Sequence, residues 1–584
     1  MNTGGAYDDA LFLRLAQYLT QGAWLGPYTA TTLVKGPGFP LWLAAVHGLQ
    51  LPVATAASLT YGAACSAIFV ALRPWIAGAR QRVLIFAALL ACPAALSDFA
   101  VMRELIYPAL TLLVTACGLG LAARMDRTDT SIGPWCWAAA LGLCSALFVL
   151  TREEWIWLSP MAIALVLWGL EQHRRGALAW RPLCGVYGFT CLFALLPLLV
   201  VASLNRHHYG VFSVSEFTSR PFVSAYGALT RVDHAAAPRQ VPVPRETWSR
   251  IAAVSPSFAL VHNHLQGPLG DIWLGPSAKL LGRLMDADPS VRNWLSRRLQ
   301  VAVPAGNTGG AAFLQDRAGR DELFRRQIDL FFGGAHNAQA FLSGAMERES
   351  GGGWFVWMLR EAVVASGQHG SAADANRFYQ RLADEVNAAC DQGRLQCQAR
   401  RDTLRPALQW RDWSPFWTSL AYAMEQLVSM PGHAADGVLP HLGEPAALAE
   451  AESFLHDRLA VSRSSPMSVP AIAWLTVAYR YALPWFALVA VLAWLRASPW
   501  PQRRWVEPQR RLWLVGGLLL VLVLGRLALL ALIHVTAWPA ANDLRYLAPV
   551  QPLLVLFSAM GVLLAWPARR DGRDKRAIDA AGSE

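Results

Sequence analysis

Long apolar stretches recur along the chain and alternate with short polar turns. Nine windows hold enough consecutive apolar residues, roughly 17 to 25, to cross a bilayer as helices. A tenth stretch, Pro37–Gln50, is too short to span, and its Trp42 is typical of a helix lying along the membrane surface. The pattern predicts an all-α polytopic membrane protein with about nine transmembrane helices. The nine windows lie near 53–73, 83–100, 104–123, 134–150, 154–170, 183–203, 471–496, 512–535 and 546–567.

The turns between these windows differ in charge, which predicts an orientation. Lys/Arg-rich short loops stay in the cytoplasm, and the basic segments are 73–82, 124–127, 173–181, 503–511 and the tail 568–584. Parity then places the remaining turns on the outer face. We expect a bacterial inner-membrane protein with these parts: a periplasmic first loop with an interfacial helix (1–52), a transmembrane bundle (53–203), a periplasmic domain (204–470), C-terminal transmembrane helices (471–567) and a cytoplasmic tail (568–584).

The polar region 204–470 is too long for a structureless loop. Apolar residues recur at helical spacing in 372–390, and the same spacing is present in 321–332, 354–365 and 416–430. We therefore expect a large, mainly α domain inserted between the spans.

Cys390 and Cys397 are the two cysteines of this polar region. Outside the cytoplasm such a pair favours a disulfide, which would contribute roughly 2–3 kcal/mol by closing a short loop. A metal site at this spacing is less favoured because no histidine accompanies the pair.

Composition narrows the class of protein. The chain is 54% hydrophobic and 16% charged, with a mean hydropathy of +0.30, which excludes an ordinary soluble enzyme. Much of the net charge of +11 sits in short loops, so it indicates orientation and not a nucleic-acid partner. No phosphate-binding glycine motif is complete, which disfavours nucleotide binding. Met1 leads into a polar stretch without a signal-peptide pattern, so we expect either translocation of a short tail or a span upstream.

Ionisable and tyrosine residues gather in four segments of the predicted outer face. An ionisable side chain near a span is costly, so it usually faces a cavity or a partner. Each group alone has a simpler reading, as a helix cap, an interfacial ion pair or a membrane anchor. Together on one face they favour a functional site. The residues are Asp8, Asp9 and Lys35; Arg103, Glu104 and Tyr107; Arg152, Glu153 and Glu154; and Asp543, Arg545 and Tyr546.

This set of side chains fits one kind of chemistry. A carboxylate in a partly dry site acts as a general base on a hydroxyl, and Arg and Lys bind and neutralise a phosphate leaving group. At the outer membrane face, this suits group transfer from a lipid-linked phosphate donor whose tail stays in the bilayer.

Four segments also resemble a known family. They are Gly22–Tyr28 (GAWLGPY), Lys35–Ala44 (KGPGFPLWLA), Leu150–Glu154 (LTREE) and Arg545–Pro552 (RYLAPVQP). With the acidic pair before them, they resemble GT-C glycosyltransferases, above all protein O-mannosyltransferases and lipid A aminoarabinose transferases. The resemblance covers 1–203 and 471–567. It lacks the first span of the family and any family domain in 204–470.

The resemblance implies roles for the residues above. In a GT-C-like bundle, Asp8 or Asp9 would be the base, and Lys35, Arg103, Arg152 and Arg545 would hold the phosphate of a polyprenyl-phosphate sugar. Transfer would invert the anomeric carbon, with a divalent metal possible but not favoured. The acceptor stays open among lipid, glycan and protein. The supporting residues would be Glu104, Tyr107, Glu153, Glu154, Asp543 and Tyr546.

Three alternatives belong beside this hypothesis. One is an O-antigen-ligase-like glycan transferase, which also has a large external loop. The others are a transporter and a non-catalytic scaffold. A transporter should carry ionisable sites at mid-membrane, and here residues such as Arg526 are few.

Overall fold

The computed structural model describes most of the chain: residues 8–96, 101–125, 132–234, 239–275, 278–299, 301–303, 310–406, 408–429, 445–459, 468–498, 507–538 and 541–565. The predicted basic tail 568–584 lies outside these ranges. Within them every regular element is a helix, apart from an isolated bridge between Val232 and Cys397. The all-α fold predicted from the sequence is therefore confirmed for the part of the chain that is described.

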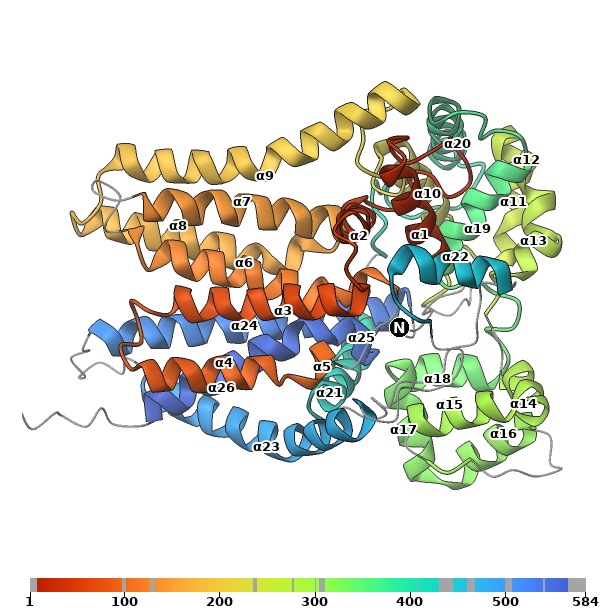
Figure 1. Cartoon of the computed structure of the whole chain (residues 1–584). Helices are drawn as coiled ribbons and strands as arrows, with labels where there is room; N and C mark the ends of the chain where they lie inside the picture. The colour runs from red at the N-terminus through yellow and green to blue at the C-terminus, as the bar shows by residue number, and fades with distance from the viewer. Residues whose placement is uncertain are drawn as a thin grey trace, which may run out of the picture.

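Long apolar helices run side by side as a bundle (Figure 1). Six stretches are long and apolar enough to cross a membrane, namely α3, α7, α9, α23, α24 and the run Leu544–Ala565 that contains α26. The chain is thus polytopic. The bundle consists of α3 (Val53–Ala71), α4 (Ala79–Leu90), α6 (Tyr107–Ala122), α7 (Gly133–Thr151), α8 (Ser159–Arg174), α9 (Trp180–Tyr209), α23 (Ser468–Arg496), α24 (Glu507–Thr536) and α26 (Gln551–Ala565).

Three bundle helices are shorter than the sequence windows that predicted them. α4 has 12 residues, and α6 and α8 have 16 each, because turns and short helices break the apolar windows at their ends. A helix needs roughly 17 residues to cross the hydrocarbon core. That these three span the membrane remains a prediction.

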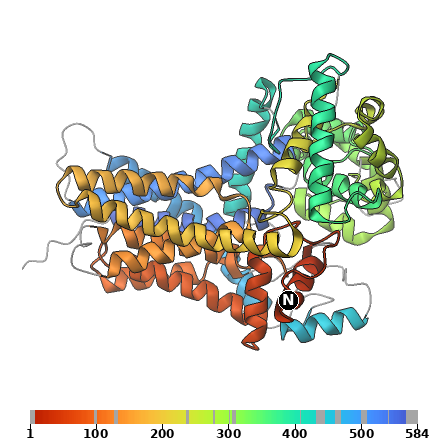
Figure 2. The same ribbon diagram turned by 90° about the horizontal axis from the view of Figure 1, so that it is seen from above.

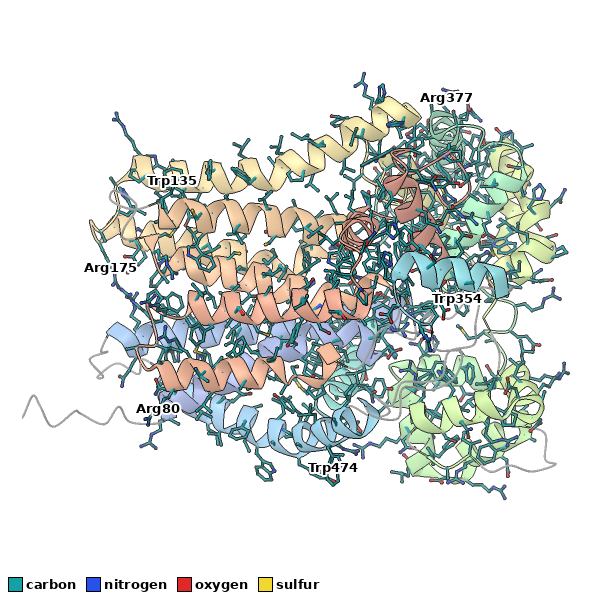
Figure 3. The ribbon with its side chains drawn as sticks, viewed as in Figure 1. Arg80, Trp135, Arg175, Trp354, Arg377 and Trp474 are labelled. Carbon is teal, nitrogen blue, oxygen red and sulfur yellow. A yellow bond between two sulfur atoms is a disulfide. The ribbon has the colours of Figure 1, made fainter. Side chains whose placement is uncertain are left out.

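The two ends of the bundle differ in character. Arg80 and Arg175, from turns predicted to be basic, lie at one end together with Trp135, whereas Trp354 and Arg377 lie beyond the other end (Figure 3). Nearly all of the polar region packs at this second end (Figures 1 and 2). Which end faces the periplasm remains a prediction.

Two helices of the first loop and several short turns lie at the second end. α2 is too short to span and runs across the axes of the long helices (Figures 1 and 2). Its placement at the membrane surface remains a prediction. The elements here are α1 (Asp8–Thr20), α2 (Gly38–Gly48), α5 (Pro93–Leu96), η1 (Arg103–Leu105), η3 (Trp155–Leu158), α25 (Leu544–Leu547) and η5 (Ala548–Val550).

The polar region has two hydrophobic cores. One is continuous with the core of the bundle and is built from α10–α13, α19 and α20; the second belongs to α14–α18, which form a separate block in Figure 1. The helical periods read from the sequence appear as α17, α19, α20 and α21. The helices are α10 (Arg220–Thr230), α11 (Arg245–Val254), α12 (Pro256–Gln266), α13 (Pro268–Asp271), α14 (Ala278–Ala287), α15 (Pro289–Leu299), α16 (Gly310–Arg320), α17 (Glu322–Phe332), α18 (Ala335–Leu342), α19 (Gly352–Ala365) and α20 (Ala372–Asp391).

The last helices of this region return to the membrane part of the molecule. They follow η4 (Trp410–Asp412) and are α21 (Trp413–Ser429) and α22 (Pro445–Leu455). In α21, Ser419 Oγ donates to the carbonyl of Ala531 on α24 at 3.3 Å, and the carbonyl of Leu427 accepts from Gln551 Nε2 at 3.2 Å. In α22, the carbonyl oxygen of Phe454 lies 2.8 Å from a ring nitrogen of His47 on α2.

A buried ion pair ties the first loop to the polar region. Arg360 on α19 contacts both carboxylate oxygens of Glu216 at 3.0 Å, and its Nη2 also donates to the carbonyl of Thr32 at 3.0 Å. The Glu216 amide donates to the carbonyl of Leu33 at 2.6 Å, and Tyr379 donates to its side chain at 3.0 Å. Because both charged side chains are buried, each depends on the other.

Replacing Arg360 by methionine is expected to destabilise the protein by about 3–5 kcal/mol, because it leaves the Glu216 carboxylate buried without its cation. The measurement is the midpoint of thermal unfolding of the detergent-purified protein. The matched control is Arg377→Met, which removes an exposed pair with Asp374 and should change stability by at most about 1 kcal/mol. Equal midpoints for the two variants would contradict a buried, dependent pair.

The same pair predicts a pH dependence. Burial disfavours the charged form of Glu216, but Arg360 and His369 outweigh it and lower the pKa from 4.5 to about 2. The stability that ionised Glu216 contributes is therefore complete above pH 4.5 and is lost as the pH falls toward 2. The difference in unfolding midpoint between wild type and Glu216→Gln should stay constant above about pH 5 and narrow below it. A constant difference down to low pH would argue against the pair.

Candidate functional site

The turn that carries Lys35 lies directly against the C-terminal end of α7. A Cβ on Gly36 would sit 2.2 Å from the carbonyl oxygen of Leu150, and one on Gly38 would sit 2.6 Å from Thr151 Oγ1. Only glycine allows the backbone to approach this closely. The two glycines therefore hold Lys35 beside the charged turn that follows α7.

The first turn of α1 brings Asp8 to this lysine. Lys35 Nζ donates to Asp8 Oδ2 at 2.9 Å and lies 5.5 Å from the centroid of the Trp357 ring. Asp9 is buried, and its Oδ1 accepts from the amide of Ala10 at 2.7 Å. The structure thus separates the two aspartates, because only the Asp8 carboxylate is seen in contact with Lys35 among the described interactions.

Arginines and carboxylates from two turns form a network beside this pair. Arg152, just after α7, donates to Glu104 at 2.5 Å and to Glu154 at 2.9 Å. Arg103, in η1, donates to Glu153 at 3.0 Å and lies 4.0 Å from Glu104. The side chains of Arg152 and Glu104 are 3% and 4% exposed, whereas those of Glu153 and Glu154 are 32% and 29% exposed. The network therefore has a buried centre and an accessible rim.

A third helix contributes Arg526, which the sequence analysis had noted only as an ionisable residue within a span. It is fully buried in α24, pairs with Glu154 and donates to the carbonyl of Tyr546 at 3.2 Å. The available signal in the sequence was a charge inside an apolar span, which usually marks a partner or a function. The sequence does not show which turn that partner would come from.

Aromatic rings surround the buried guanidinium groups. Arg152 Cζ lies 5.2 Å from the ring centroids of both Tyr107 and Tyr546, and Arg526 Cζ lies 5.7 Å from Tyr107 and 5.6 Å from Trp157. Trp157 Nε1 donates to the Tyr107 hydroxyl at 3.1 Å. Ring faces attract cations, so these contacts partly offset the cost of burying the arginines.

The last charged turn, before α25, lies on the side of the α14–α18 block. Asp543 pairs with Arg298 of α15, a contact that no sequence pattern indicated. Arg545 Nη1 lies 3.3 Å from Met102 Sδ, beside the η1 turn that carries Arg103. Arg545 therefore approaches the network from the opposite side to Lys35.

The environment keeps the carboxylates of this site ionised. Burial raises the pKa of Asp8, but Lys35, Arg103 and Arg152 outweigh it, so the pKa lies below the ordinary value. Glu154 behaves in the same way, with burial opposed by Arg152 and Arg526. For Asp543, burial is outweighed mainly by Arg298, and the pKa falls to about 2.

The four predicted segments therefore converge at one end of the bundle. Asp8 and Lys35 lie beside the network of Arg103, Glu104, Arg152, Glu153 and Glu154, whose rings and flanks come from Tyr107, Tyr546, Asp543 and Arg545. The positions are observations, and the catalytic and binding roles remain predictions.

The other sequence predictions concern cysteine and metal. Cys390 and Cys397 are joined in a disulfide with a Cα–Cα distance of 5.6 Å, where α20 meets the segment that follows it. Among the described residues, no group of three or more histidine, cysteine or acidic side chains is placed to hold a metal ion.

Chemically, this arrangement combines an ionised carboxylate with several fixed cations at a bundle end. The carboxylate can accept a proton, and the cations can bind an anionic group with two or more oxygens. The accessible rim matters most, because an incoming anion can replace the exposed carboxylates of Glu153 and Glu154 without disturbing the buried pair.

Comparison with known proteins gives weak similarity. No family model and no curated protein matches the chain. Two crystal structures of ArnT from Cupriavidus metallidurans do match, one in the apo state and one bound to undecaprenyl phosphate. Both are 14% identical to this chain and are covered over 73% of their own length. The matches cover 96% and 95% of this chain, with TM-scores of 0.28 and 0.29 respectively.

Replacing Gly36 by alanine is expected to destabilise the protein by roughly 1–3 kcal/mol, because the added methyl group would overlap the carbonyl of Leu150. Gly48→Ala at the end of α2 is the matched control, since nothing lies within 4 Å of the added atom. Thermal unfolding in detergent compares the two variants. A Gly36 variant as stable as the Gly48 variant would show that the Lys35 turn does not pack on α7 as described.

Proposed function

We propose that the chain is a membrane glycosyltransferase of GT-C type. It would transfer a sugar from a polyprenyl-phosphate donor to an acceptor of the cell envelope, at the periplasmic face of a bacterial inner membrane. The observation that carries the proposal is the meeting of Asp8 and Lys35 with the arginine network at the end of a bundle of membrane-spanning helices.

The position of this cluster suits a lipid-linked donor. A polyprenyl tail stays among apolar helices, and its phosphate lies at the end of the bundle, where Lys35, Arg103, Arg152 and Arg545 gather. Arginine and lysine are the usual ligands of phosphate. Among these groups, Arg103 and Lys35 reach the accessible side, while Arg152 is held in the buried centre.

The proposed reaction is a single displacement. Asp8 takes the proton from an acceptor hydroxyl, and the oxygen of that hydroxyl attacks the anomeric carbon from the face opposite the phosphate. The new glycosidic bond forms as the bond from the anomeric carbon to the phosphate oxygen breaks. Polyprenyl phosphate then leaves with the electron pair, and the anomeric configuration is inverted. The lowered pKa of Asp8 supports its role as an ionised base at neutral pH.

Binding of the donor phosphate requires an exchange of partners. In the structure, Arg103 pairs with Glu153, and Arg152 pairs with Glu104 and Glu154. We expect the phosphate to take the place of the Glu153 carboxylate on Arg103, because Glu153 lies at the rim and can turn into water. Arg152 would act mainly through its charge.

Asp8→Asn is expected to reduce sugar transfer by about 10²–10⁴-fold, because the amide cannot accept the proton. The first measurement is the glycan profile of envelope fractions from a deletion strain, complemented with wild type or with the variant at equal protein level. The second is consumption of a polyprenyl-phosphate sugar by the purified protein in proteoliposomes.

Two further variants sharpen this test. Asp9→Asn changes the neighbouring carboxylate and should spare transfer if Asp8 is the base, and Asp384→Asn changes an exposed residue of α20 far along the chain. Normal glycan profiles with Asp8→Asn would refute Asp8 as the base. Profiles that do not differ between the deletion strain and wild type would favour a scaffold or another non-catalytic role.

A further inference from the structure

A second site lies at the other end of the bundle, away from the proposed catalytic cluster. It is a cavity of about 470 Å³ between α6, α8 and α24. Pockets that hold small molecules range from about 300 to 1,000 Å³, so this one is large enough for a ligand. No step of the proposed glycosyl transfer uses it.

Small side chains create the apolar floor of this cavity. Gly118 and Ala122 lie one turn apart on α6, and Ala164 faces them from α8. A Cβ on Gly118 would lie 2.9 Å from Met161 Sδ, so the helices are close at this point. The space therefore opens toward the helix ends, where larger apolar side chains such as Leu514 of α24 form the walls.

Two tryptophans place the cavity at the level of a membrane interface. The rings of Trp75 and Trp168 are 6.4 Å apart, and both line the cavity. Trp168 Nε1 donates to the carbonyl of Ala122 at 3.0 Å, which fixes its ring. Tryptophan concentrates where the hydrocarbon core meets the headgroups.

The lining of the cavity carries three arginines and one carboxylate. Arg174 ends α8, Arg510 and Arg511 lie in the first turns of α24, and Glu171 is the carboxylate. Glu171 is held by Arg175 at 2.8 Å and lies 3.5 Å from Arg510. The charge around the opening is therefore positive, and Figure 3 shows Arg175 at this end of the bundle.

An apolar cavity beside a cluster of guanidinium groups fits one occupant. We propose that this site binds an anionic phospholipid of the surrounding bilayer, with an acyl chain between α6, α8 and α24 and its phosphate against Arg174, Arg510 and Arg511. Basic pockets between membrane helices are the recognised means of holding anionic headgroups. A zwitterionic lipid would fill the same apolar space but gain less from the arginines.

The experiment is native mass spectrometry of the full-length protein in detergent, titrated with phosphatidylglycerol or with phosphatidylcholine of the same chains. Wild type should bind phosphatidylglycerol at least about tenfold more tightly. The double variant Arg174→Gln/Arg511→Gln should lose up to about thirtyfold of that affinity, because each arginine near the headgroup contributes about fivefold. Equal affinities for the two lipids in wild type would overturn the proposal.

Two control variants separate this site from general surface charge and from a simple headgroup patch. Arg73→Gln/Arg80→Gln removes two exposed arginines outside the cavity and should leave binding unchanged. Ala164→Phe fills the apolar part while keeping every arginine, and it should also weaken phosphatidylglycerol binding. Loss of affinity in the Arg73/Arg80 variant equal to that in the Arg174/Arg511 variant, or no loss with Ala164→Phe, would contradict a lipid bound in the cavity.

A free anion is the remaining source of the same phosphate chemistry. Inorganic phosphate added to the titration should not displace phosphatidylglycerol and should not raise the unfolding midpoint, whereas phosphatidylglycerol should raise it through binding to the folded state. Displacement by inorganic phosphate at millimolar concentration would replace the lipid proposal with a soluble-anion site. The unfolding midpoints of all variants also show that each one is folded.

Discussion

The buried ion pair between Arg152 and Glu104 constrains the structure around it. Neither side chain has enough contact with water to stay charged without the other, and removing one would leave an uncompensated charge in a region of low dielectric. The turn after α7 and the η1 turn before α6 must therefore meet. Arg526 extends the same constraint to α24 through Glu154, so helices distant in sequence are fixed together at one point.

Much of this arrangement follows from the sequence because short turns leave little freedom. Helices that alternate in direction bring every second turn to the same end of a bundle, so Arg103, Arg152 and Arg545 could be placed near one another by counting spans. Helices such as α20 were also predictable, since an apolar stripe with a period near 3.6 is visible in the letters themselves.

Other features depend on packing that no local pattern records. Arg298 reaches Asp543 only because the α14–α18 block folds around its own core and lies beside the bundle end. The tie between Glu216 and Arg360 joins residues 144 positions apart in the sequence. Neither helical periodicity nor turn residues encode such distances, and the partner of Arg526 was hidden for the same reason.

The path of α21 and α22 decides how far the polar region is an independent unit. It leaves the bundle after α9, but before re-entering at α23 it places α21 against α24 and the start of α26, and α22 against α2. Cutting the chain at 204 and 470 would strip these two helices of the surfaces they cover. The insert is therefore not a module that can be excised or exchanged between proteins, and a soluble fragment for crystallography would have to end before α21.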